Sequence, residues 1–250
     1  LSVERRLPAD EPHGGVAKAG ASPETIKGGD GSPQADRSPG IHERPVMPSS
    51  YFDSPLPRIL AHRGLAVDAP ENTLPAFRAA LAAGADYIET DAHVTVDGVA
   101  VLAHDPDVAD GATRVEIATT TRSRLQAVDL GAGASIPRLD EVLEALPRAR
   151  FNIDVKAEGA VEAVVDAVRS ASAVDRVLLT SFHGPTRRAL AAAIPGVATS
   201  ASSDLVLAAL LPCHLGLSAI VRRLLRGVSC VQIPERHRGI PLVTRRTVRS

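Results

Sequence analysis

From residue 58 onward, the apolar residues of this chain follow two alternating patterns. Short apolar runs, typical of buried β-strands, are separated by segments in which apolar residues recur every three or four positions, as on one face of an α-helix. Strands are expected at residues 59–61, 87–91, 99–103, 151–155, 176–181, 197–200 and 228–233. Helices are expected at residues 73–83, 139–146, 161–168, 185–193 and 204–226. This alternation predicts an α/β fold with parallel strands and helical crossovers.

Residues 1–57 lack such a pattern. They hold 9 of the 19 prolines and 7 of the 19 glycines, which is typical of a disordered segment. We therefore expect a disordered tail at 1–57 and one globular domain at 58–250. The tail has no apolar run of the kind found in secretory signals, but the chain begins with Leu1, so a targeting segment upstream stays open as an alternative.

Composition narrows the class of protein. With 250 residues, 44% of them hydrophobic, and a net charge of -1, the chain can bury a full core and has no global bias toward nucleic acid. Aromatic residues make up only 2%, which leaves few platforms for stacking bases. Cys213 and Cys230 match neither a metal-binding spacing nor a disulfide framework, so we expect buried thiols in a reducing compartment and a cytoplasmic location.

Polar side chains gather between residues 59 and 105, each at the end of an apolar run or just after one. Charges in such places are costly unless they are paired or bound to a metal, so their convergence predicts a functional site. Glu89 and Asp91 lie two positions apart on an expected strand and therefore share a face, which outlines a site for a hard cation. The members of the group are His62, Arg63, Glu71, Asn72, Glu89, Asp91, His104 and Asp105.

A β-hairpin is expected after this strand, because Asp97-Gly98 is a strong two-residue turn signal. If that turn closes the hairpin, residues whose numbers sum to 195 face each other, which places His104 opposite Asp91. A proton donor or acceptor would then sit beside the cation. The inference depends on the register, since a slip of one residue would turn His104 to the other face.

The order and spacing of these residues resemble the glycerophosphodiester phosphodiesterase family. The resemblance covers residues 58–248 and implies a (β/α) barrel of the TIM type in place of an open sheet. It also implies a metal-dependent enzyme that hydrolyses glycerophosphodiesters to glycerol 3-phosphate and an alcohol. The matching motifs are His62-Arg63-Gly64, Glu71-Asn72-Thr73, Glu89-x-Asp91 with Asp97-Gly98, His104-Asp105, and Asn152-Ile153-Asp154-Val155-Lys156. The family has Glu where this chain has Asp154.

The barrel is expected to be truncated before its last two strands. Six barrel strands are expected, and the chain stops at Ser250 just as residues 244–249 begin another helix. A whole barrel takes about 250 residues, and fewer are left here after the tail.

Barrel enzymes act at the C-terminal ends of their strands, where the candidate residues lie. Asn152, Asp154 and Lys156 share one face of a strand. Together with the resemblance, these positions predict that Glu89, Asp91 and Asp154 bind one divalent cation, Mg²⁺ or Ca²⁺, since both ions prefer oxygen ligands.

The remaining site residues receive roles from their chemistry and from the resemblance. His62 and His104 are the expected catalytic residues, because imidazole can give and take protons near neutral pH. Arg63 and Lys156 are expected to bind the substrate phosphate. The resemblance implies that Glu71 orients a histidine or a substrate hydroxyl.

Two further functional classes stay open. The same centre could act on lysophospholipids, as a lysophospholipase D does, or on another phosphodiester, or the chain could be an inactive truncated fragment that only binds phosphate. The expected partner is a small glycerophosphodiester and no nucleic acid. Residues 205–221 are nearly uncharged and favour a buried helix over a membrane span. Arginines within residues 217–226 leave a weak contact with a membrane surface open.

Overall fold

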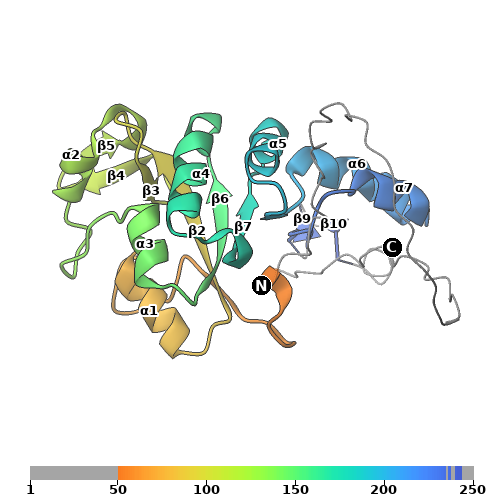
Figure 1. Ribbon diagram of the computed structural model, residues 1–250, viewed down its shortest axis with the longest axis horizontal. Coiled ribbons are helices and arrows are strands. Elements are labelled where there is room, and N and C mark those ends of the chain that lie inside the picture. The colour runs from red at the N-terminus through yellow and green to blue at the C-terminus, as the bar shows by residue number, and fades with distance from the viewer. Residues whose placement is uncertain (1–49, 235, 238–239, 244–250) are drawn as a thin grey trace, which may run out of the picture. The chain divides into compact units, whose positions relative to one another are not determined.

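The computed structural model describes residues 50–234, 236–237 and 240–243, and these centre on a sheet of parallel strands (Figure 1). The parallel strands follow one another in the order β1, β2, β6, β7, β8. Within the described residues this sheet runs from β1 to β8 without the pairing that would close a barrel. The bounds are β1 (Leu60–His62), β2 (Tyr87–Val94), β6 (Arg150–Val155), β7 (Val177–Thr180) and β8 (Ala198–Thr199).

Helices connect the parallel strands, as their alternating patterns predict. In α4, for example, Val164, Val165 and Val168 are buried against the sheet side while Glu162 and Arg169 occupy the first and last turns. Such a stripe at helical spacing holds the helix on the sheet. The connecting elements are α1 (Leu74–Ala82), α3 (Leu139–Ala145), η3 (Glu158–Ala160), α4 (Val161–Ser170), η4 (Val174–Arg176) and α5 (Gly184–Ala193). The predicted α/β fold is thereby confirmed.

An excursion separates β2 from α3. It begins with β3 (Ala100–Leu102), which pairs antiparallel with β2. A hairpin of β4 (Asp107–Asp110) and β5 (Thr113–Glu116) follows, and then η2 (Ile117–Thr119) and α2 (Arg122–Gln126). The excursion has an apolar cluster of its own, which includes Val101, Ile117, Leu125 and Ile136.

The β2–β3 hairpin forms as predicted, but its predicted register is wrong by one residue. Ala92 faces Leu102 and His93 faces Val101, so paired numbers sum to 194 instead of 195. The loop holds three residues, because Gly98 adopts a positive φ of 77° and its N–H donates to the Thr95 carbonyl. Asp91 therefore lies across from Ala103, whose N–H donates to the Asp91 carbonyl.

The two faces of the sheet carry different side chains. On one face, Ile88, Phe151 and Ile153 are fully buried in the main apolar cluster together with residues of α1, α3, α4 and α5. The Phe77 and Phe151 rings meet edge to face there, with centroids 5.8 Å apart. The opposite face carries the polar residues toward the C-terminal ends of the strands.

The other end of that polar face is closed by residues from the predicted tail. Tyr51 and Phe52, in η1 (Ser50–Phe52), are buried in a second apolar cluster with Tyr87, Leu178 and others. The Tyr87 hydroxyl donates to the Tyr51 carbonyl at 2.8 Å. The packed structure thus includes Tyr51 and Phe52, which lie before the expected boundary at residue 57. Residues 1–49 of the predicted tail lie outside the described residues.

The C-terminal part of the described chain departs from the predicted elements. Residues 204–226 form two helices, α6 (Ser203–His214) and α7 (Ser218–Leu224), because Gly216 between them has a φ of +74°. The expected strand at 228–233 does not form as a continuous strand, and in its place Cys230 makes an isolated parallel bridge with Ser200. A short hairpin of β9 (Arg236–His237) and β10 (Ile240–Pro241) follows. The helix expected at residues 244–249 lies outside the described residues.

Candidate active site

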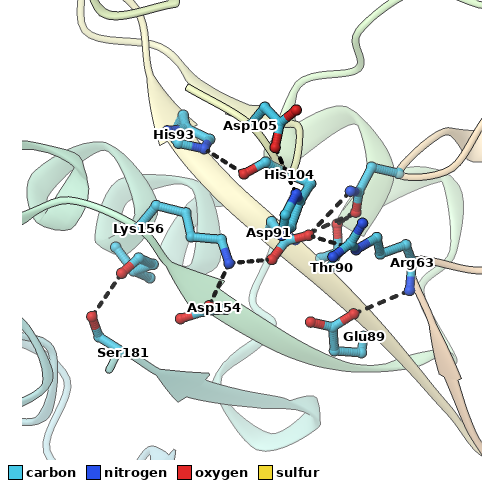
Figure 2. Close-up of polar contacts among 12 residues, drawn as sticks. Arg63, Glu89, Thr90, Asp91, His93, His104, Asp105, Asp154, Lys156 and Ser181 are labelled. Carbon is cyan, nitrogen blue, oxygen red and sulfur yellow. Dashed lines mark hydrogen bonds and ion pairs between the residues drawn. The ribbon is translucent and has the colours of Figure 1, made fainter. Parts of the chain in front are cut away.

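The predicted site residues lie at or near the C-terminal ends of β1, β2 and β6. Figure 2 shows six of them, Arg63, Glu89, Asp91, His104, Asp154 and Lys156. The strand register aligns them, because His62 pairs with Glu89, and Asp91 pairs with Asp154. Side chains at paired positions of parallel neighbours point to the same face of the sheet. Three carboxylates from β2 and β6 therefore point to one face, next to the ends of β1 and β3.

Lys156 lies between two of the three carboxylates. Its Nζ is 2.6 Å from Oδ1 of Asp91 and 2.7 Å from Oδ2 of Asp154, as Figure 2 shows. Both aspartates are buried, and a buried carboxylate requires such a partner. Burial alone would lower the pKa of Lys156, but its hydrogen bonds to Asp154 and Asp91 outweigh burial and raise that pKa. The ammonium is therefore held in its charged form.

Glu89 is the least compensated of the three carboxylates. Its Oε2 accepts the backbone N–H of Arg63 at 3.0 Å, and the His62 Nε2 lies 3.9 Å away. Burial and then the nearby charge of Asp91 raise the pKa of Glu89 to about 7. Burial also raises the pKa of Asp154, against the opposing effect of Lys156. The site thus holds three carboxyl groups close together, an arrangement that is common in functional sites.

Arg63 joins the loop after β1 to the loop before α1. Its Nη1 is 3.0 Å from Oε1 of Glu71, and its Nε is 3.5 Å from Oδ2 of Asp91. Its backbone has a φ of 57°, a conformation that non-glycine residues rarely adopt. Gly64 follows it with a φ of +84°, where a Cβ would stand 2.9 Å from the Ala76 carbonyl carbon. Glu71 thus contacts the expected phosphate-binding arginine and neither histidine.

Asn72 supports the centre of the site, a role that the sequence patterns did not reveal. Its Nδ2 donates to Oδ2 of Asp91 at 3.2 Å, and its Oδ1 accepts from the Thr90 hydroxyl at 2.7 Å. Its backbone φ is 56°, and its N–H donates to the Arg63 carbonyl. Its burial could have been suspected from its place between Glu71 and Thr73, directly before a helix.

His104 lies beyond the end of β3, so the alternation of strand faces does not decide where its ring points. Its Nδ1 donates to Oδ1 of Asp105 at 2.8 Å, and Figure 2 shows the ring beside Asp91. Asp105 is therefore a partner of the expected catalytic histidine, which the sequence did not indicate. The His62 imidazole is more exposed than that of His104. Burial and then the charge of Arg63 lower the pKa of His62, against the opposing effects of Asp91 and Glu71.

A pocket of about 300 Å³ opens beside the site on the His104 side. It lies between the loop before α1, the end of β3 and the β4–β5 hairpin. Leu102, Leu130 and Ile136 contribute apolar surface to it, while Glu71 and His104 are shared with the site. A molecule held by the site could extend into this pocket.

The types of ligand present fit a divalent cation. In the described part of the chain, however, no group of three or more His, Cys, Asp or Glu side chains is already positioned to hold a metal ion. The single ammonium of Lys156 already contacts both Asp91 and Asp154, so one positive charge can reach both carboxylates. Among the described residues, the buried Oδ1 of Asp154 has no hydrogen-bond partner. Oxygen ligands of this kind suit Mg²⁺ or Ca²⁺.

Comparison with known proteins identifies the family. The model of the glycerophosphoryl diester phosphodiesterase family matches residues 62–246. The chain belongs to this family. A Mycobacterium tuberculosis relative named "Probable glycerophosphodiester phosphodiesterase 2" is 41% identical over 194 residues, which cover 76% of this chain and 74% of the relative. The enzyme class expected from the motifs, that of the glycerophosphodiester phosphodiesterases, is thereby confirmed.

Solved structures of the family share the fold. A glycerophosphodiester phosphodiesterase from Agrobacterium tumefaciens is 31% identical, with a TM-score of 0.55 over 60% of this chain and 68% of that one. A phosphodiesterase from Oleispira antarctica, solved with sn-glycerol-3-phosphate, is 26% identical, with a TM-score of 0.54 over 58% of this chain and 65% of that one. The predicted barrel-type fold class is confirmed by these relatives.

Proposed function

We propose that the protein hydrolyses glycerophosphodiesters to glycerol 3-phosphate and an alcohol at the C-terminal ends of β1, β2 and β6. The observation that carries the proposal is the position of two imidazoles, His62 and His104, around one buried group of carboxylates. Family membership supports the reaction class, and the Oleispira relative was solved with glycerol 3-phosphate bound.

Glu89, Asp91 and Asp154 are the residues that would hold a divalent cation, Mg²⁺ or Ca²⁺. When bound, such an ion neutralises phosphate oxygens and the charge that grows on them during hydrolysis. Asp154 is one methylene shorter than the glutamate of the family motif. The cation and the Lys156 ammonium would compete for the same oxygens of Asp91 and Asp154, since Lys156 contacts both.

Arg63 and Lys156 are the residues that would bind the phosphate. Arg63 approaches Asp91, and Lys156 contacts both Asp91 and Asp154, so their charges offset those of the two carboxylates. Glu71 is 3.0 Å from the Arg63 guanidinium, so we assign it the orientation of Arg63. Asn72 would hold Asp91 in place.

His62 and His104 would move the protons. His104 lines the pocket of about 300 Å³, so we assign to that pocket the alcohol that leaves and to His104 the proton that this alcohol receives. The His104 Nδ1 donates to Asp105, which leaves Nε2 for the substrate. His62, beside Glu89, would take the proton from the nucleophile. If that nucleophile is the neighbouring hydroxyl of the glycerol, a cyclic phosphate forms first and should be trapped in a quenched reaction.

The proposal is tested with glycerophosphocholine, with release of glycerol 3-phosphate and of choline measured separately. We expect turnover with Mg²⁺ or Ca²⁺ and loss of turnover with a chelator, reversed when the ion is restored. A parallel reaction with lysophosphatidylcholine decides whether the lysophospholipid alternative applies. A folded protein that turns over no phosphodiester with either ion would overturn the proposal in favour of a chain that only binds phosphate.

A further inference from the structure

The two C-terminal helices expose an unusual amount of aliphatic surface. On α6 and at its end, Leu207, Leu211 and Leu215 are 69%, 68% and 64% exposed. Leu217 and Ile220, at the start of α7, are 43% and 46% exposed. These five residues, together with Arg222, Arg223 and Arg226, are called the α6–α7 face below. The sequence pattern of residues 205–221 had favoured a buried helix, and for these leucines that prediction is wrong.

Helical geometry accounts for the exposure. Leu207, Leu211 and Leu215 recur every four residues and therefore line one side of α6. Ala209 and Cys213, on another side, are buried with Val221 and Leu225 of the α7 segment in a small cluster. The two helices thus pack on each other through this cluster, while Leu207, Leu211 and Leu215 remain outside it. Contiguous exposed apolar surface of this kind marks an interaction site.

The charged residues at the end of α7 and just after it are all arginines. Arg222, Arg223 and Arg226 are exposed, and residues 203–226 contain one acidic residue, Asp204. Asp204 lies at the far end of α6, where its Oδ2 is 3.8 Å from Nη1 of Arg188 on α5. Within the described chain, no ion pair engages Arg222, Arg223 or Arg226. The α6–α7 face therefore combines exposed leucines with positive charge that no ion pair among the described residues compensates.

We propose that the α6–α7 face docks on an anionic lipid surface, with its leucines in the headgroup region and its arginines on lipid phosphates. Interfacial helices bind through both contributions, the buried apolar area and the attraction between basic residues and anionic lipids. The chain's own N-terminal segment is a poorer complement, since residues 1–49 hold seven acidic and six basic residues and so have no strong negative charge. None of the helices in the described ranges is long and apolar enough to cross a bilayer, so the contact is with the surface.

The test uses the full chain, a chelator, and vesicles of phosphatidylcholine with or without 30% phosphatidylglycerol in a sedimentation assay. We expect binding to the anionic vesicles that weakens as salt rises. Arg222→Gln with Arg223→Gln should reduce the partition coefficient about fivefold per arginine. Leu211→Ser with Leu215→Ser should reduce it about tenfold or more, because each leucine side chain loses the gain from leaving water.

Matched controls change equally exposed residues elsewhere. Val96, in the β2–β3 turn, is 61% exposed, and Val96→Ser should leave vesicle binding unchanged. Arg78→Gln on α1 with Arg148→Gln after α3 removes the same charge as the arginine pair and should have little effect. Circular dichroism and thermal melting verify that each variant is folded.

Three results would overturn the proposal. One is no binding to anionic vesicles at low salt. Another is binding that the α6–α7 variants and the control variants reduce alike, since that would indicate general charge attraction. A third is a dimer in solution that the leucine variants dissociate while vesicle binding is absent, which would assign the face to a second copy of the chain. Hydrolysis is not the readout, so failure here leaves the proposed function untouched.

Discussion

The two faces of β2 and β6 carry side chains of opposite kinds. On the face toward the helices, Ile88, Phe151 and Ile153 are packed in apolar surroundings without polar partners. One residue along the same strands, Asp91 and Asp154 are buried and Glu89 is partly buried, and their charges repel one another. Neighbouring residues thus act on stability in opposite directions, since one face stabilises the fold and the other gives up stability, as expected for the proposed site.

This difference predicts that substitutions on the polar face change mainly activity, whereas substitutions on the apolar face change mainly stability. The largest effect is expected at a proposed catalytic group. His104→Ala should lower kcat about 10²–10⁴-fold, because the leaving alcohol loses its proton donor. His104 is partly exposed, so the melting temperature should change little. His214→Ala, which alters a histidine on α6, is the control, and equal activity of wild type and His104→Ala would contradict the assignment.

On the apolar face, Phe151→Ala should destabilise the protein by about 3–5 kcal/mol, since it opens a cavity beside Phe77. Chemical denaturation measures the loss. Phe182 is 73% exposed, and Phe182→Ala should stay within about 0.5 kcal/mol of wild type. Similar losses for both variants would show that the core has been placed wrongly.

The pH dependence of the free energy of unfolding, measured with a chelator present, tests the environment of Glu89. Its pKa rises from 4.5 to about 7 in the folded protein, chiefly because the carboxyl is buried. The folded state then holds a proton that the unfolded state releases, so stability should fall as pH rises from 4.5 through about 7 and stay level above. The full fall amounts to about 3 kcal/mol.

In Glu89→Gln this loss should be absent, which would make the variant more stable than wild type at pH 8. The control Glu162→Gln changes an exposed glutamate on α4 and should keep the wild-type profile. Parallel profiles for wild type and Glu89→Gln would mean that Glu89 ionises as freely in the folded chain as in the unfolded one.

A smaller effect is expected at Lys156. Because its ammonium competes for Asp91 and Asp154, Lys156→Met should bind Mg²⁺ or Ca²⁺ about tenfold more tightly, which corresponds to about 1.4 kcal/mol. Hydrolysis should nevertheless fall, since the phosphate loses a cation. Arg78→Met on α1 serves as the control. Weaker cation binding in Lys156→Met would indicate that the lysine assists the cation.

The alternation of strands and helices could be predicted from sequence because each element has its own period of apolar residues. The shared face of Glu89 and Asp91 followed from the alternation of side chains along a strand. That Asp154 joins them was predicted from the same alternation together with the family resemblance, which makes the two strands parallel neighbours at one mouth.

Other features depend on contacts that no local pattern reveals. The hairpin register slipped because Gly98 takes a positive φ and lengthens the loop by one residue. Tyr51 and Phe52 pack on Tyr87, 36 residues beyond Tyr51, although they follow a Pro/Gly-rich stretch. Asn72 reaches Asp91 from a left-handed backbone conformation, which Arg63 also adopts. Such long-range geometry was not visible in the spacing of motifs.

The most direct test of the central claim, that the polar face of β2 and β6 holds a divalent cation, is a calorimetric titration of Mg²⁺ or Ca²⁺ into metal-free protein. We predict one ion per chain for wild type, binding at least tenfold weaker for Asp154→Asn, and unchanged binding for Ile153→Val on the opposite face of the same strand. Equal affinity of wild type and Asp154→Asn would contradict the account.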